Sequence, residues 1–324
     1  MKVIILTEGT GATGYGHLTR CLSICQAFEE KKITPLFVVN CDERGKDFLP
    51  NVHLNCFNWL FELEKLYNII DRADVLIIDS YLAPSEIYKE VASRVGNAVF
   101  IDDYRRIEYP SGIIVNGAIG AEYLGYEINN IHKLLLGVKY SPIRKEFWDV
   151  SPIARRGIVK NVLITFGGQD IRNLTFTVLE SLLSSYSYLR YHVVLTKDNK
   201  EIGDEIISNP NINFYYSLQA QRMLDIMLQC DVAVSAAGQT LYELARVGLP
   251  TVAIGVIENQ RNNIVGWREA GFLNNELWFN QSDLLETINK DISKIIEWKE
   301  QPKTIDCDGQ GARRIFKNIL NMHS

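Results

Sequence analysis

The chain alternates short apolar runs with amphipathic stretches along almost its whole length. A strand inside a parallel sheet is a continuous apolar run, whereas a helix that covers the sheet is apolar on one face only. The alternation therefore predicts repeated strand–helix–strand units and a doubly wound α/β fold. In the first half we expect strands at Lys2–Leu6, Leu36–Val39, Val75–Asp79, Ala98–Ile101, Ile113–Val115 and Lys133–Leu136, and helices at Leu18–Glu30, Phe61–Asp71 and Pro84–Arg94.

This rhythm stops between residues 137 and 160, in a stretch with Pro142, Pro152, Gly157 and several basic residues. Such a composition is typical of a connection between domains. We therefore predict two Rossmann-like domains, at residues 1–140 and 161–324, joined by a linker at 141–160. In the second half we expect strands at Asn161–Phe166, Tyr191–Thr196, Asp231–Ser235 and Thr251–Ile254, and helices at Asn173–Ser185, Gln239–Val247, Asn259–Ala270, Asp283–Trp298 and Arg313–Asn321.

Composition narrows the class of protein. The 324 residues are enough for two ordinary domains, and 47% hydrophobic with 23% charged residues predicts packed cores. The net charge of −5 argues against a general nucleic-acid binder, which would carry a basic face. The first apolar run, Met1–Leu6, is too short for a signal peptide or a membrane span. We therefore expect a cytoplasmic protein with no integral membrane segment.

The residues that bind metals show no convincing pattern. The six cysteines are scattered and no two have CxxC spacing, so neither a zinc ribbon nor a CxxC redox motif is indicated and free thiols are expected. Asp102 and Asp103 follow a predicted strand, but adjacent side chains on an extended chain point in opposite directions. We interpret them as a solvated or structural pair, and expect no metal and no cofactor.

A glycine-rich turn follows the first predicted strand. Gly9, Gly11 and Gly14 have the GxGxxG spacing of dinucleotide-binding proteins. Two features disfavour a nicotinamide or flavin site: the glycines continue to Gly16, and the first acid after the second strand, Asp42, comes late for contacting a ribose. The turn more simply lets a bulky ligand approach the backbone, with a dinucleotide as the alternative.

His17 is expected at the start of the following helix, at the carboxyl edge of the sheet, where open α/β sheets bind ligands. The positive end of a helix disfavours a second positive charge, which keeps the imidazole neutral and able to accept a proton. The alternative is a histidine that only hydrogen-bonds the turn. The other histidines show no metal spacing and are assigned to the core or the surface: His53, His132, His192 and His323.

The second half contains a turn with the composition of a phosphate site, from Ser235 to Glu243. Gly238, Gln239 and Thr240 open a predicted helix and would present free N–H groups to a diphosphate. Glu243, one turn further, would accept hydrogen bonds from two ribose hydroxyls. The alternative is ordinary capping, with Glu243 solvated or paired with Thr240 in a capping box. A weaker turn of the same kind contains Gly167 and Gly168.

Several short stretches are informative in combination. They are Gly14-Tyr15-Gly16-His17-Leu18-Thr19-Arg20, Leu76-Ile77-Ile78-Asp79-Ser80-Tyr81, Ile101-Asp102-Asp103, Tyr140-Ser141-Pro142-Ile143-Arg144-Lys145-Glu146-Phe147, Gly167-Gly168-Gln169-Asp170, Ala237-Gly238-Gln239-Thr240 with Glu243, and Glu258-Asn259-Gln260. Together they resemble the GT-B superfamily of nucleotide-sugar enzymes. The chain is most similar to the UDP-2,4-diacetamido-2,4,6-trideoxy-β-L-altropyranose hydrolases of pseudaminic acid biosynthesis, over about residues 1–270.

The resemblance implies roles for individual residues. In that family a histidine of the glycine loop is the general base, a tyrosine lines the sugar site, an asparagine lies near the sugar diphosphate, and a glutamate binds the ribose. Here these are His17, Tyr81, Asn259 and Glu243. The wider set expected to bind substrate and nucleotide is Gly14, Gly16, Arg20, Gly167, Gly168, Ser235, Gly238, Gln239, Thr240, Glu243 and Gln260.

The sequence therefore predicts an inverting, metal-independent hydrolase that binds a UDP-sugar between its domains and cleaves the anomeric C–O bond, with His17 activating water. A GT-B glycosyltransferase is the alternative, because Gly238-Gln239-Thr240 is closer to sugar transferases than the serines that the hydrolases often carry. A nucleotide-sugar-binding protein without turnover is a third hypothesis. No nucleic-acid partner is expected, and the oligomeric state stays open.

Overall fold

A computed structural model of the chain describes residues 1–128, 130–154, 157–168, 170–195, 206, 208–297 and 307–322. These residues form two compact units. The first comprises Met1–Trp148 and Asp308–Ser324, and the second Asp149–Cys307. Within the described ranges, no helix has both the length and the apolar character that crossing a bilayer requires.

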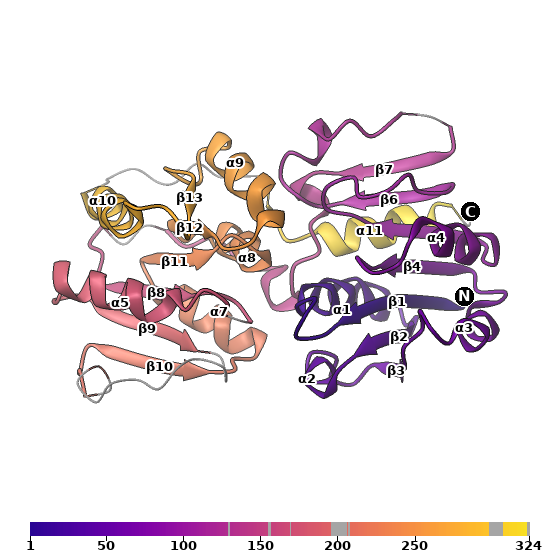
Figure 1. Cartoon of the computed structure of the whole chain (residues 1–324), viewed down its shortest axis with the longest axis horizontal. Coiled ribbons are helices and arrows are strands. Elements are labelled where there is room, and N and C mark those ends of the chain that lie inside the picture. Colours follow the sequence, from indigo (N-terminus) through magenta and orange to yellow (C-terminus); the bar gives the residue numbers. More distant parts are fainter. Residues whose placement is uncertain are drawn as a thin grey trace. The chain divides into compact units, whose positions relative to one another are not determined.

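The first unit is built on a seven-stranded sheet in which all neighbouring strands are parallel (Figure 1). The strand order is β3-β2-β1-β4-β5-β6-β7. The chain winds outward from β1 to β3 and then restarts at β4 on the other side of β1, so a topological switch point lies between β1 and β4. The strands are β1 Val3–Gly9, β2 Leu36–Cys41, β3 His53–Cys56, β4 Val75–Asp79, β5 Asn97–Ile101, β6 Gly112–Asn116 and β7 His132–Leu136.

Helices flank this sheet and bury their apolar faces in the core. Fully buried Trp59 lies in the core and donates its Nε1–H to the carbonyl of Thr7 in β1 at 2.8 Å. The helices are α1 Gly16–Glu29, α2 Glu43–Lys46, α3 Leu63–Ile70, α4 Ser85–Ser93 and α11 Gly311–Leu320, with 3₁₀ turns η1 Ala121–Tyr123, η2 Val138–Tyr140 and η3 Lys145–Phe147.

The C-terminal helix α11 belongs to the first unit, whereas the sequence assigned residues 161–324 to the second domain. The ring of Phe316 meets that of Phe28 in α1 edge-on, with centroids 4.8 Å apart, and Arg313 pairs with Glu30 at 2.8 Å. Helical periodicity predicts that this helix exists. It carries no information about its partner, which is a surface formed much earlier in the chain.

The second unit repeats the same plan with a six-stranded parallel sheet of order β10-β9-β8-β11-β12-β13 (Figure 1). Its switch point lies between β8 and β11. The strands are β8 Asn161–Thr165, β9 Arg190–Leu195, β10 Ile212–Tyr216, β11 Val232–Ala236, β12 Thr251–Gly255 and β13 Leu277–Trp278. The helices are α5 Leu174–Ser185, α7 Ala220–Gln229, α8 Gln239–Val247, α9 Arg261–Glu269 and α10 Leu284–Glu297, with the 3₁₀ turn η4 Glu258–Gln260.

The predicted doubly wound α/β architecture is confirmed by both sheets. The sequence did not predict β3, β10, β13, α7 or the short helix α2. β3, β10 and β13 lie at sheet edges, where partial exposure or a length of two residues leaves no sustained apolar run. Two predicted element ends, Thr196 and Trp298, lie outside the described residues.

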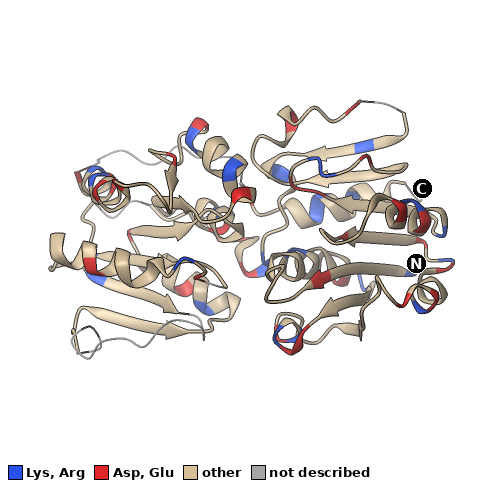
Figure 2. Ribbon diagram, in the orientation of Figure 1, with Lys and Arg blue, Asp and Glu red and all other residues tan. Residues whose placement is uncertain are grey.

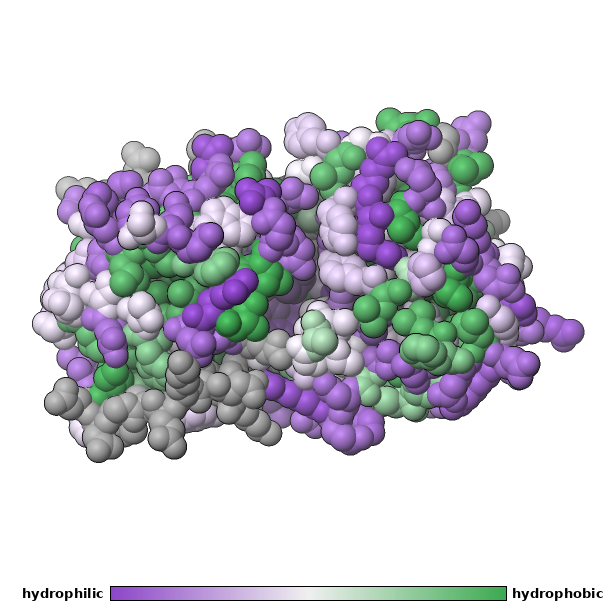
Figure 3. All heavy atoms as spheres, viewed as in Figure 1, coloured by the Kyte–Doolittle hydropathy of each residue, from purple (hydrophilic) through white to green (hydrophobic). Residues whose placement is uncertain are grey.

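Charged residues are carried mainly by helices and loops in both units, and the strands are largely uncharged (Figure 2). On the face drawn in Figure 3, hydrophilic residues are interspersed with smaller apolar areas on each unit. This distribution follows from a parallel sheet that is covered on both faces. The buried acids Glu8 and Asp79, at the ends of β1 and β4, are exceptions that require partners.

Gly311 is expected to be essential for the docking of α11. A Cβ at this position would lie 2.6 Å from the carbonyl carbon of Ser141. Because this is a backbone atom, no change of side-chain rotamer could relieve the contact. Gly311→Ala should lower the free energy of unfolding of the first unit by about 1–3 kcal/mol, measured by urea denaturation. Lys317→Ala, on the exposed side of the same helix, serves as control and should change it by less than about 0.5 kcal/mol. Equal stability of the two variants would contradict the close contact.

Candidate functional site

Charged side chains converge at the switch point of the first unit. Asp79 ends β4, while His17 and Arg20 lie near the start of α1. The carboxyl edge of an open parallel sheet meets the helix N-termini here. His17 is 4% exposed, Arg20 is 8% exposed and Asp79 is fully buried. The ring of His17 is therefore enclosed beside charged groups, not in the apolar core.

Asp79 accepts hydrogen bonds from both of these neighbours. The Nδ1 of His17 lies 2.7 Å from its Oδ1, and the Nε and Nη2 of Arg20 lie 2.5 and 2.6 Å from its two oxygens. Burial alone would raise the pKa of Asp79, but the Arg20 guanidinium and His17 outweigh it and hold that pKa well below its usual range. Asp79 is thus a buried anion fixed by a bidentate arginine.

The ionised Asp79 selects the tautomer of His17. Nδ1 also lies 3.1 Å from Nη2 of Arg20, which can only donate, whereas the carboxylate of Asp79 can only accept. The contact with Asp79 is shorter, at 2.7 Å, and it assigns the proton to Nδ1, which leaves the lone pair on Nε2. Among the described residues, Nε2 has no hydrogen-bond partner. An oriented neutral imidazole whose protonated form is stabilised by a neighbouring anion has the properties of a general base.

Arg20 connects this pair to Asp103, which follows β5. Its Nη1 lies 2.6 Å from Oδ1 of Asp103, and the hydroxyl of Tyr81 donates to the other oxygen. Burial would lower the pKa of Arg20, but Asp103 and Asp79 raise it well above its ordinary value, so the guanidinium stays charged. One cation between two carboxylates leaves these three side chains with a formal charge of about −1.

Tyr81 is held at both ends. Its ring meets that of His17 edge-on, with centroids 4.4 Å apart and an interplanar angle of 89°. Its N–H donates to the fully buried Glu8 at 2.7 Å, and the Ser80 hydroxyl donates to the same carboxylate at 2.6 Å. Burial and the nearby Asp103 raise the pKa of Tyr81, so its hydroxyl keeps its proton. Tyr81 is thus an uncharged side chain that is held in a fixed position against the imidazole.

The glycine turn is anchored by Asp42. Its carboxylate accepts hydrogen bonds from the N–H groups of Gly11 and Gly45 at 2.9 and 2.7 Å, and from the hydroxyl of Tyr15 at 3.2 Å. Slight burial raises the pKa of Asp42, but the two N–H donors outweigh it and lower this pKa. A carboxylate engaged in this way is not free to bind a ribose, which argues against the dinucleotide alternative.

The N-terminus of α1 is open to a ligand. Tyr15 occupies the N-cap without a side-chain hydrogen bond, and the first turn contains no acid. Gly14, with a φ of +79°, and Gly16 have nothing within 4 Å of the position that a Cβ would take. A bulky ligand therefore has room to approach the backbone beside His17.

In the second unit, α8 begins at the switch point between β8 and β11. Gly238 is its N-cap without a side-chain hydrogen bond, and its first turn contains no acid. In the part of the chain that the structure describes, the N–H groups of Gln239 and Thr240 have no hydrogen-bond partner. Two buried side-chain atoms at this switch point also have no partner among the described residues: Nε2 of Gln239 and Oγ1 of Thr165, the last residue of β8. This edge of the sheet has the properties of an anion site.

Glu243 and Ser235 are both buried. Glu243 is 2% exposed, one turn into α8. The capping box that was the alternative does not form, because Gly238 is the N-cap and Thr240 lies inside the helix. Ser235 is fully buried in β11, and its hydroxyl donates to the carbonyl of Ala236 at 3.0 Å.

Gln260 lies beside the start of α8. Its Oε1 accepts from the N–H of Val256 at 2.9 Å, and its Nε2 lies 3.5 Å from the position of a Cβ on Gly238. The neighbouring Asn259 is exposed in η4. The structure thus brings Gln260 to the predicted diphosphate turn and leaves Asn259 accessible next to it.

The turn after β8 is also open. Gly167, with a φ of +78°, and Gly168 have nothing within 4 Å of a Cβ position. Asp170 caps α5 by accepting hydrogen bonds from the N–H groups of Leu174 and Thr175, both at 2.9 Å. The predicted Gln169 lies outside the described residues.

The sequence assigned no role to Glu8 or Asp79, and it interpreted Asp103 only as part of a solvated or structural acidic pair, not as a partner of Arg20. Asp79 carried a recognisable signal, because an acid that ends a wholly apolar strand is buried by the sheet and needs a partner. Glu8 and Asp103 carried a weaker signal, since their partners lie on elements far away in sequence.

Asp102 has a structural role. The sequence had interpreted the acidic pair as either solvated or structural, and the structure agrees with the second interpretation for this residue. Its Oδ2 accepts from the hydroxyl of Tyr126 at 2.6 Å, and its Oδ1 from the N–H of Asp103 at 2.8 Å and of Arg106 at 3.3 Å. Across the described ranges, no group of three or more His, Cys, Asp or Glu residues could hold a metal ion.

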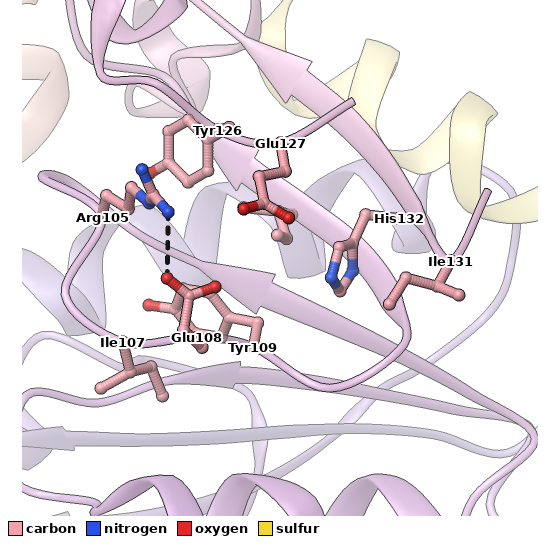
Figure 4. Close-up of a pocket in the computed structure, with 9 residues that line it drawn as sticks. Arg105, Ile107, Glu108, Tyr109, Tyr126, Glu127, Ile131 and His132 are labelled. Carbon is pink, nitrogen blue, oxygen red and sulfur yellow. Dashed lines mark hydrogen bonds and ion pairs between the residues drawn. The ribbon is translucent and has the colours of Figure 1, made fainter. Parts of the chain in front are cut away.

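A small cavity of about 150 Å³ lies in the first unit beside β6, between the loops around residues 105–109 and 126–132 (Figure 4). Arg105 and Glu108 form an ion pair at 3.0 Å on its wall, and Tyr126, Glu127 and His132 line it as well. None of the predicted site residues contributes to this lining. The cavity is therefore separate from the cluster around His17.

Comparisons of sequence relate the chain to nucleotide-sugar proteins. No protein-family model matches it. It is 27% identical over 270 residues to a Helicobacter pylori protein named pseudaminic acid cytidylyltransferase and UDP-2,4-diacetamido-2,4,6-trideoxy-beta-L-altropyranose hydrolase, covering 80% of this chain and 45% of that protein. It is also 27% identical over 283 residues to an uncharacterised Methanocaldococcus jannaschii protein, covering 81% of this chain and 57% of the relative. The chain thus spans about half the length of these two relatives.

Comparison of structures gives the fold. The UDP-GlcNAc 2-epimerase of Methanocaldococcus jannaschii, solved with UDP-GlcNAc and UDP, matches with a TM-score of 0.66 at 14% identity, over 99% of this chain and 100% of the other. A likeness at this low identity is a statement about architecture alone. The chain has the GT-B fold, and in sequence it is a relative of the Helicobacter pylori pseudaminic acid protein.

Proposed function

We propose that this protein is an enzyme that hydrolyses a UDP-linked amino sugar of the 2,4-diacetamido-2,4,6-trideoxyhexose type, releasing UDP and the free sugar without a metal ion. The observation that carries the proposal is the contact of 2.7 Å between Nδ1 of His17 and Asp79, which leaves Nε2 as a proton acceptor. The hydrolase in the name of the Helicobacter pylori relative supports the choice of substrate class.

In the proposed reaction, Nε2 of His17 takes a proton from water as the water oxygen bonds to the anomeric carbon. The bond between that carbon and the phosphate oxygen breaks, and its electron pair leaves with UDP. Asp79 and the net negative charge of the cluster stabilise the imidazolium that forms. Attack from the face opposite the leaving group inverts the anomeric centre.

The second unit supplies the leaving-group site in this proposal. The unpaired N–H groups of Gln239 and Thr240 would bind the diphosphate and stabilise the charge that develops on UDP. Glu243 would accept hydrogen bonds from the ribose. Tyr81 and Asn259 would orient the sugar, with Tyr81 already fixed against the imidazole.

A glycosyltransferase is a second candidate, favoured by one observation. Leu82 and Tyr104 are 50% and 42% exposed beside the site, and the ring of Tyr104 meets that of Tyr81 with centroids 5.8 Å apart. Exposed apolar side chains next to a general base are suited to an acceptor molecule. In that case His17 would deprotonate an acceptor hydroxyl instead of water.

Release of UDP distinguishes these functions. The purified protein, given the UDP-linked diacetamido sugar in water labelled with heavy oxygen and without an acceptor, should release UDP. Phosphorus NMR follows the release, and mass spectrometry should find the label in the free sugar and none in UDP. Label in UDP would contradict attack at carbon. Release that requires an added acceptor would identify a transferase, and tight binding without release a binding protein.

Variants of the imidazole pair test the proposed base. His17→Ala should lower the turnover number by roughly 10²–10⁴ while the dissociation constant for UDP changes little, because the nucleotide binds elsewhere. Asp79→Asn should lower turnover by a similar factor, since an amide stabilises neither the tautomer nor the imidazolium. His53→Ala, an exposed histidine on β3, is the control and should keep the full rate. Near-full turnover in His17→Ala would overturn the mechanism.

Gly238→Asp tests the diphosphate site independently of catalysis. Aspartate is a favourable N-cap residue, so the free energy of unfolding should stay the same or rise by a few tenths of a kcal/mol. Its carboxylate would occupy the free N–H groups and repel the diphosphate, so the dissociation constant for UDP, measured by calorimetry, should rise roughly tenfold or more. Gly238→Asn caps without charge and should weaken UDP binding less. Unchanged affinity in Gly238→Asp would place the nucleotide elsewhere.

A further inference from the structure

Two thiols that are 15 residues apart in sequence meet at the edge of the first unit's sheet. Cys41 is the last residue of β2 and Cys56 is the last residue of β3, which pairs with β2 in parallel. Their sulfur atoms lie 3.1 Å apart. A disulfide requires about 2.05 Å between sulfurs, so a shift of about 1 Å would complete one.

The two thiols differ in their exposure to solvent. Cys56 is exposed and Cys41 is partly exposed, whereas Cys21, Cys25, Cys230 and Cys307 are buried. Burial and the neighbouring Cys56 thiol raise the pKa of Cys41 to about 12, while the Lys46 ammonium acts in the opposite direction. Cys56 is therefore the thiol that a reagent in solution reaches first, and Cys41 is the neighbouring thiol that would resolve the oxidised form, the resolving thiol.

The thiol pair is joined to the glycine turn by one residue. Cys41 precedes Asp42, whose carboxylate holds the N–H of Gly11 at 2.9 Å and the hydroxyl of Tyr15. Gly45, whose N–H also bonds to Asp42, packs closely on Cys41, because a Cβ on Gly45 would lie 2.8 Å from Cβ of Cys41. Drawing Cys41 toward β3 would thus pull Asp42 away from the turn that leads into α1.

We propose that Cys41 and Cys56 are a site of reversible oxidation to a disulfide by a peroxide, and that the disulfide loosens the glycine turn beside His17. The thiolate of Cys56 attacks the peroxide O–O bond and becomes a sulfenic acid, with release of one water. The thiol of Cys41 then attacks that sulfur and expels a second water, leaving the disulfide. Both sulfurs are oxidised and one hydrogen peroxide is reduced to two waters. Formation of the disulfide and loosening of the turn are independent of the proposed function. Only a resulting change in the activity of His17 would rest on it.

Mass spectrometry of the full chain tests the site. After brief treatment with dilute hydrogen peroxide, the intact mass should fall by about 2 Da, and a digest without reductant should contain one peptide that links Cys41 to Cys56. Dithiothreitol should reverse both changes. Wild-type protein that keeps both thiols free, links other cysteines or adds only oxygen atoms would overturn the proposal.

Single variants test the order of events. In Cys41→Ser, a sulfenic acid should persist at Cys56 and be trapped by dimedone, because the resolving thiol is absent. In Cys56→Ser, the same treatment should leave Cys41 far less modified, since its thiol is less accessible and its pKa is raised. Equal trapping at both cysteines would contradict the assignment of Cys56 as the attacking thiol.

Hydrogen exchange tests the coupling without any substrate. The N–H of Gly11 should exchange about tenfold faster in the oxidised protein than in the reduced one, because its bond to Asp42 is weakened. Peroxide-treated Cys56→Ser, which cannot form the disulfide, is the control and should match the reduced wild type. A disulfide that leaves this exchange rate unchanged would overturn the coupling, whatever the enzymatic activity of the protein proves to be.

Discussion

The burial of Asp79 is the constraint on which the first unit's candidate site depends. A carboxylate without solvent is tolerated only when cations and donors surround it, and here Arg20 and His17 supply them from the start of α1. The same hydrogen bonds that compensate for burial also fix the position of α1 at the switch point and the tautomer of the imidazole. The same contacts therefore stabilise the fold and orient the imidazole that we propose as the proton acceptor, so loss of Asp79 would affect both.

The two switch points have opposite electrostatic character, although the strands follow the same plan. In the first unit, the carboxyl edge of the sheet is occupied by the protein's own acids, Asp79 and Asp103 among them, which would repel a diphosphate. In the second, α8 begins without a capping side chain or an acid in its first turn. These equivalent positions in the fold correspond to the different roles that we propose for them, which are proton transfer at the first and anion binding at the second.

Local patterns of sequence predicted what local forces determine. Apolar runs gave most of the strands, and the glycine turn placed His17 at the first residues of α1. The partners of His17 were harder to predict, because Asp79 lies 62 residues away and reaches it only through the pairing of β1 with β4. The packing of α11 against α1 could not be predicted for the same reason, and the sequence left open whether the C-terminal helices return to the first domain. The periodicity of a helix reports an apolar face and not the surface that will cover it.

His17 has two supports of different strength. Asp79 holds the side chain through a buried hydrogen bond of 2.7 Å, and breaking this bond would leave a buried carboxylate without one of its donors. The backbone before it depends on Asp42, which is exposed and accepts hydrogen bonds mainly from N–H groups. A displacement of about 1 Å at a reacting group is enough to change the rate of a reaction strongly. Compared with a change at Asp79, a change at Asp42, the weaker of the two supports, would therefore alter the position of His17 more easily. The thiol pair of Cys41 and Cys56 adjoins this support, and the charged cluster can stay intact while the turn moves.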